Sequence, residues 1–193
     1  MGAAALLACA GAVATDSQRA AATDSARAAA ARRPSHPCAG ANLYPSAANV
    51  RVVDAATLCL VNRLRSAYGL RPLRANRALS HVAASQVTSM VRLDYFADVG
   101  PSGQTPLSLV AVTGYALHAA QFAVGENIAW GTGSYTTPAH IVAEWMASPP
   151  HREVMLNAEY RNAGVAVTPA VPAVLYAPGH GATYAIELGV RRF

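Results

Sequence analysis

One glutamate inside an apolar strand constrains the fold of this chain more than any other feature. Residues 122–130 are mostly apolar, with the β-branched and aromatic residues that favour a buried strand, and Glu126 is the single charged residue among them. An unpaired carboxylate inside a protein is costly. Glu126 must therefore either reach water in a cleft or meet a polar partner beside the strand.

The segment that follows this strand predicts a turn and then two helices. Glycines at 131 and 133 favour the turn. Thr137 is a typical N-cap, and Pro138 is favoured at the first position of a helix. Ser-Pro-Pro at 148–150 ends that helix, and a further short helix is predicted at 150–156.

The remaining elements follow from apolar periodicity and from the turn residues that end each segment. The predicted helices cover residues 48–68, 76–94 and 105–113, and the predicted strands cover 162–168 and 182–190. Asn76 is the expected N-cap of the second helix. This mixture of helices and strands indicates an α+β domain.

The first 36 residues predict an export leader and a linker. Residues 3–14 are apolar and end in an Ala-Val-Ala cleavage pattern, so 1–14 is predicted to be a signal peptide. No charged segment precedes the apolar run, so the leader is expected to be truncated at its start. Cys9 follows Leu-Leu-Ala, and lipoprotein anchoring through Cys9 is the alternative. Residues 15–36 are an Ala/Arg-rich linker, and 37–193 form the domain.

Charge excludes one class of partner. The chain has 15 basic residues, all arginine, and a formal net charge of +5. Aromatic residues are not interleaved with these arginines, so nucleic-acid binding is not predicted. The arginines that crowd residues 51–92 are expected on a solvated face, and contact with anionic cell wall or lipid headgroups is the alternative.

Two cysteines follow the leader, Cys38 and Cys59. An even pair in an exported chain favours a disulfide, which would hold residues 38–48 against the first helix. Two free thiols are the alternative.

Several motifs together resemble the CAP superfamily, which includes cysteine-rich secretory proteins, antigen 5 and plant pathogenesis-related proteins. The resemblance is to the bacterial secreted branch and spans roughly 38–190. The motifs that carry it are Leu-Val-Asn-Arg at 60–63, Gly-Leu-Arg-Pro-Leu at 69–73, Asp-Tyr-Phe at 94–96, Gly-Glu-Asn-Ile-Ala at 125–129, Trp-Met-Ala-Ser-Pro-Pro-His-Arg at 145–152 and Asn-Ala-Gly-Val-Ala-Val at 162–167. The resemblance implies a three-layer α-β-α sandwich around an antiparallel-rich sheet.

The resemblance also implies a cleft with two histidines and two glutamates. His151 and Glu126 match this pattern. The first histidine falls on Asp98, which is a departure. The second glutamate falls near Ser148, and the nearby Glu144 does not match cleanly.

A divalent metal, zinc or calcium, is sometimes held between the family's histidines. Here His151 and Asp98 are the candidate ligands, and an aspartate in place of a histidine predicts weaker binding and a preference for harder cations. His140 and Glu144 share a helix face and are secondary candidates. The alternative for these two residues is an exposed pair without a ligand.

Two functions from different classes are compatible with these residues. The first is a secreted, monomeric module whose cleft binds lipid, peptide or glycan. The second is a metal-assisted hydrolase of cell-wall peptide or glycan that would use His151, Asp98 and Glu126. Asp98 discriminates between them, because the hydrolase needs it as a ligand or as an acid/base group and the binding module does not.

Overall fold

Strand β4 (Gly181–Arg192) is the centre of the fold, because residues 182–189 are all buried. A strand buried on both faces needs helices above and below its sheet. The computed structural model describes residues 37–177 and 179–193. The predicted signal peptide, linker and Cys9 lie outside the described residues.

The sheet has four strands in the order β1-β3-β4-β2. β3 (Asn162–Thr168) and β2 (Gln121–Thr132) both pair antiparallel with β4. β1 (Arg74–Ala75) is parallel to β3. β2 therefore lies at one edge of the sheet, with β4 as its only strand neighbour among the described residues.

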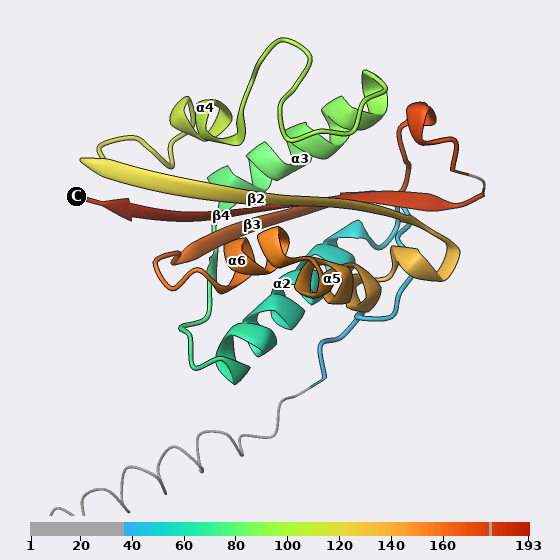
Figure 1. Ribbon diagram of the computed structural model, residues 1–193, viewed down its shortest axis with the longest axis horizontal. Helices are drawn as coiled ribbons and strands as arrows, with labels where there is room; N and C mark the ends of the chain where they lie inside the picture. Colours follow the sequence, from blue (N-terminus) through green and yellow to red (C-terminus); the bar gives the residue numbers. More distant parts are fainter. Residues whose placement is uncertain (1–36, 178) are drawn as a thin grey trace, which may run out of the picture. The chain divides into compact units, whose positions relative to one another are not determined.

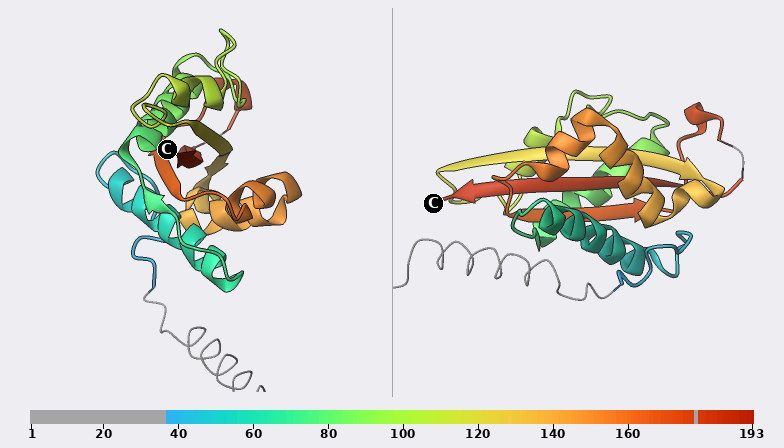
Figure 2. Two further views of the ribbon diagram at one scale, coloured as in Figure 1. Left: turned by 90° about the vertical axis from the view of Figure 1, so that its left-hand side faces the viewer. Right: turned by 60° about the horizontal axis from the view of Figure 1, so that its bottom comes forward.

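Two layers of helices cover the faces of this sheet (Figures 1 and 2). The helices on one face are α2 (Val50–Ala67), α5 (Pro138–Ala147) and α6 (Pro149–Leu156). The helices on the other face are α3 (Arg77–Arg92) and α4 (Pro106–Ala111). Two 3₁₀ turns, η1 (Gly133–Thr136) and η2 (Ala173–Leu175), complete the elements. The expected three-layer α-β-α sandwich is confirmed.

The sheet has a hydrophobic core on each face, and side chains of β4 contribute to both. Tyr184, Ile186 and Leu188 pack with Trp145 in the core beneath α2 and α5. Ala185 lies between Tyr184 and Ile186, so its side chain points to the opposite face, and it packs in the core beneath α3. Successive residues of a strand point to opposite faces, so one apolar strand fills two cores.

Helix α3 approaches the sheet unusually closely at Gly164 on β3. A Cβ at this position would lie 2.0 Å from the backbone nitrogen of Ser80 and 2.1 Å from the carbonyl carbon of Leu79. Only glycine leaves room for the helix backbone at this distance.

Helix caps form where the sequence predicted them. The side chain of Asn76 accepts hydrogen bonds from the backbone N–H groups of Ala78 and Leu79. Thr137 accepts from His140 at the start of α5, where Pro138 takes the first helical position. The boundaries of these two helices are therefore set by local side-chain chemistry.

The first helix is tied down at its middle and near its C-terminal end. A disulfide joins Cys38 to Cys59 in the middle of α2, with their Cα atoms 5.7 Å apart, as predicted. In the last turn of α2, the fully buried guanidinium of Arg65 donates to the carbonyls of Met155 at 2.7 Å and Asn157 at 3.0 Å. These bonds satisfy carbonyls at the end of α6 that the helix itself leaves unpaired.

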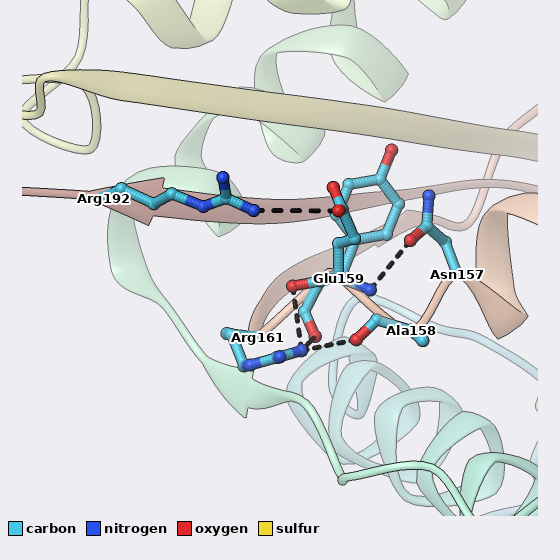
Figure 3. A network of polar contacts seen from close by, with 6 residues as sticks. Asn157, Ala158, Glu159, Arg161 and Arg192 are labelled. Atoms are coloured by element: carbon cyan, nitrogen blue, oxygen red, sulfur yellow. Dashed lines mark hydrogen bonds and ion pairs between the residues drawn. The ribbon is translucent and has the colours of Figure 1, made fainter.

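The turn before β3 is held by a second arginine (Figure 3). Arg161 donates to the carbonyls of Ala158 and Glu159, at 2.6 and 2.9 Å. The carboxylate of Glu159 also lies 3.7 Å from Arg192 at the end of β4. This network fixes where the chain enters β3.

None of the helices among the described residues is long and apolar enough to cross a membrane.

Candidate ligand-binding cleft

A cleft of about 800 Å³ opens along the outer edge of β2. Residues 128–132 of β2 line it consecutively, the loop 96–98 that follows α3 forms one side, and α5 forms the other. Phe96, Trp130 and Tyr135 supply aromatic walls. A cavity of this size with apolar walls and a few polar groups is typical of ligand-binding sites.

The predicted site residues converge on this cleft with one exception. Asp98, Ser148, His151, His140 and Glu144 all line it. Glu126 does not; it precedes Ile128 on the same face of β2, and both of its carboxylate oxygens are buried. The sequence required Glu126 to meet either water or a polar partner, and in the structure it meets a partner.

That partner is Glu187 of β4. The two glutamates are directly paired across the antiparallel strands, and successive residues alternate between sheet faces, so both side chains point towards the α3 layer. Glu187 is fully buried. Within the described part of the chain, no hydrogen-bond donor from another residue reaches either carboxyl group.

Burial raises the pKa of both carboxyl groups, and the charge of the opposite glutamate raises the pKa of Glu126 further. The nearby charge of Asp98 acts in the same direction on both. These raised pKa values mean that the pair retains a proton at neutral pH.

Two side-chain amides position the walls of the cleft through three hydrogen bonds. The side-chain amide of Asn127, which points to the opposite face from Glu126, donates to the backbone carbonyl of His151 at 2.8 Å. Gln86 of α3 donates to the carbonyls of Ala97 and Asp98 at 3.0 and 3.3 Å. Gln86 is a buried core glutamine whose amide bonds to the backbone, and it anchors the loop that carries Asp98.

His140 and Glu144 form a pair at the outer rim. His140 Nε2 lies 3.5 Å from Glu144 Oε1, one helical turn away on α5. The ring of Tyr135 contacts that of His140 edge-on, with centroids 4.5 Å apart. These contacts hold an imidazole and a carboxylate at the mouth of the cleft.

The candidate metal ligands of the cleft do not form a complete metal site from protein side chains alone. Among the described residues, no three His, Cys, Asp or Glu side chains come together in a group that could hold a metal ion. His151 and Asp98 share the cleft but have no third protein ligand of these types. Structural zinc sites have four protein ligands and catalytic ones three, so His151 and Asp98 alone fall short of either arrangement.

Sequence reasoning missed Glu187. Its signal was the same as that of Glu126: a single carboxylate within the predicted strand at 182–190, among otherwise apolar residues. This signal marks a second buried carboxylate, but whether the two carboxylates meet depends on the register between the strands.

The sequence of this chain is similar to a known protein family and to one of its bacterial relatives. The model of the cysteine-rich secretory protein (CAP) family matches residues 58–170. The uncharacterized protein YkwD of Bacillus subtilis is 33% identical over 106 residues, which cover 55% of this chain and 38% of that relative. The match therefore spans well under half the length of that relative.

Three solved structures share the fold at low sequence identity. An extracellular protein with an SCP domain from Bacillus anthracis has a TM-score of 0.56 at 20% identity, over 76% of this chain and 41% of that one. An outer surface protein from Borrelia burgdorferi has a TM-score of 0.55 at 18% identity, over 70% and 90%. A cysteine-rich secretory protein from Staphylococcus aureus has a TM-score of 0.54 at 17% identity, over 74% and 40%.

Proposed function

Since this chain belongs to the cysteine-rich secretory protein (CAP) family, we propose that it is an extracellular module that binds a ligand in the cleft beside β2. The observation that carries the proposal is the cleft itself, which gathers Asp98, Ser148 and His151 against apolar walls. Such walls bind the body of a ligand, and a few convergent polar groups fix its orientation.

An extracellular location is consistent with two observations. The Cys38–Cys59 disulfide is typical of proteins that fold in oxidising compartments. Two of the similar structures are described as an extracellular protein and an outer surface protein.

Binding is favoured over hydrolysis by the position of the acid pair. A general acid or base must come within hydrogen-bond reach of its substrate. The oxygens of Glu126 and Glu187 are buried away from the cleft surface, so they do not touch a ligand lying in it. The exposed Asp98 and the half-buried His151 are available for binding contacts.

The proposal is tested by blocking the cleft. Ala97 is exposed on its rim, and Ala97→Trp would fill the space that a ligand occupies. The matched control is Ala55→Trp, at an exposed position of α2 outside the cleft. The full chain, with its disulfide formed, is mixed with three probes: peptidoglycan sacculi, phosphatidylglycerol vesicles and a basic pentapeptide.

The proposal predicts that at least one probe binds the wild type and the Ala55→Trp variant, and that Ala97→Trp weakens this binding at least about tenfold, or roughly 1.4 kcal/mol. Equal binding by all three proteins would locate the ligand outside the cleft and overturn the proposal. Release of soluble fragments from sacculi by the wild type, lost in Asp98→Ala, would instead support the hydrolase.

A further inference from the structure

The cleft opens onto the unpaired edge of a sheet. β2 has a strand neighbour on one side only, and five consecutive residues, 128–132, line the cleft along its other side. Five residues of strand are about 16 Å long. An exposed strand edge presents backbone donors and acceptors that another extended chain can pair with.

The pairing register identifies which backbone groups face the cleft. Gly133 donates its N–H to the carbonyl of His180, at 3.0 Å, on the β4 side. The register between β2 and β4 is unbroken from there to Gln121, and hydrogen-bonded pairs alternate along an antiparallel ladder. Odd-numbered residues of β2 therefore bond to β4, and even-numbered residues point their N–H and C=O groups outwards.

One side-chain contact confirms this assignment. The indole N–H of Trp145, which comes from α5, donates to the carbonyl of Ile128 at 3.0 Å. The next outward-facing residue is Trp130, whose side chain is 39% exposed. Outside the β2–β4 ladder, no group in the described ranges hydrogen-bonds to its backbone N–H or C=O. Trp130 thus presents a free donor and a free acceptor to the cleft.

The cleft is lined by acidic side chains, although the whole protein has a positive net charge. None of the arginines in the described residues lines the cleft, whereas Asp98 and Glu144 do. Asp98 lies on the same side of β2 as the α3 layer, and Glu144 projects from α5 on the other side. Side chains of an added strand would alternate between these two sides, so each set would meet a carboxylate.

We propose that the cleft takes an extended basic peptide segment, which adds to the sheet as a further strand beside β2. This inference rests on the proposed function and specifies its ligand class. One residue of an antiparallel ligand exchanges both backbone hydrogen bonds with Trp130. Lysine or arginine side chains on one face of the ligand strand meet Asp98, and those on the other face meet Glu144. A second copy of this chain is disfavoured as the occupant, because it would bring the same acidic cleft edge to the contact.

The ligand side of the contact is tested with labelled pentapeptides in fluorescence anisotropy. The probe is Lys-Val-Lys-Val-Lys, and its matched controls are Glu-Val-Glu-Val-Glu and a version of the lysine peptide with alternate amides N-methylated. N-methylation removes strand-pairing donors and keeps the charge. The proposal predicts that the acidic peptide does not bind. It also predicts that N-methylation of the alternate amides that face β2 weakens binding by at least about tenfold, whereas N-methylation of the intervening amides leaves binding unchanged.

The protein side of the contact is tested at the outward-facing backbone N–H of Trp130. Trp130→Pro removes the outward N–H, and proline is tolerated where an edge strand's N–H faces away from the sheet. Trp130→Ala removes the same indole but keeps the N–H. We expect Trp130→Pro to bind the lysine peptide at least about tenfold more weakly than Trp130→Ala. If Trp130→Pro does not fold, the N-methylated peptides decide the question alone.

Each outcome separates this inference from the proposed function. Binding of the lysine peptide that Ala97→Trp blocks, but that N-methylation leaves unchanged, would overturn strand addition and leave the cleft as the binding site. Binding of sacculi or vesicles in the cleft, with no peptide binding, would also overturn the inference alone. Concentration-dependent dimerisation that Trp130→Pro abolishes would replace the peptide by a second copy of the chain. No binding of any probe in the cleft would overturn both.

Discussion

The buried pair of glutamates makes stability fall as pH rises, and one substitution should weaken this dependence. Both pKa values are raised, chiefly by burial, so above the ordinary glutamate pKa, near 4.3, the folded state binds protons that the unfolded state has released. The free energy of unfolding therefore falls as pH rises, by about 1.4 kcal/mol per pH unit for each extra proton bound by the folded state.

The perturbation is Glu187→Gln. Glutamine has nearly the same shape as a protonated glutamate, and its amide can donate to the remaining carboxylate of Glu126. The variant therefore binds about one proton fewer in the folded state than the wild type. We expect the slope of its unfolding free energy with pH to be smaller by about 1.4 kcal/mol per unit, or roughly 3 kcal/mol between pH 5 and pH 7.

Urea unfolding followed by tryptophan fluorescence measures this difference at pH 5, 6, 7 and 8. Asp54 contributes a slope of the same sign, because burial raises its pKa to about 7, but it does so equally in both proteins. The matched control is Glu153→Gln, at an exposed position of α6. If Glu187→Gln loses stability with pH as steeply as the wild type and the control, the pair does not hold an extra proton and the reasoning is wrong.

Three further substitutions test the packing described above by urea unfolding. Arg65→Met leaves the carbonyls at the end of α6 without donors and should cost about 3–5 kcal/mol; a loss below 1 kcal/mol would show that water replaces the guanidinium. Gly164→Ala should cost at least about 3 kcal/mol because its Cβ meets the α3 backbone, whereas Gly114→Ala, with nothing within 4 Å, should be nearly neutral; equal effects would contradict the close approach. Cys38→Ser opens a 21-residue loop and should cost about 3 kcal/mol, and no change in the reduced wild type would contradict this.

Local chemistry in the sequence was sufficient for most of the fold. Thr137 and Asn76 cap the helices that they were predicted to begin, because capping depends on one side chain and the next three residues. The strand predicted at 162–168 has the observed bounds. The strand around Glu126 extends further than predicted at both ends. The two-residue β1 was missed, since so short and exposed a strand carries no periodic pattern.

The candidate site was predictable in its parts but not in its connections. Asp98 and His151 were expected in one cleft, and both line it. That Glu126 faces Glu187 depends on the register between β2 and β4, which is set by long-range packing and by no residue near either glutamate. The outward orientation of the Trp130 backbone depends on the same register. A shift of one residue would turn it towards β4.

The most direct test of the cleft beside β2 as the binding site is residue-resolved amide hydrogen exchange along β2, measured with and without Lys-Val-Lys-Val-Lys. In the free protein we expect the Trp130 amide to exchange faster than those of Ala129 and Gly131, which face β4, by at least about tenfold. Added peptide should slow exchange at Trp130 and leave its two neighbours unchanged. A Trp130 amide that is already protected in the free protein, or one that bound peptide leaves unprotected, would contradict the account.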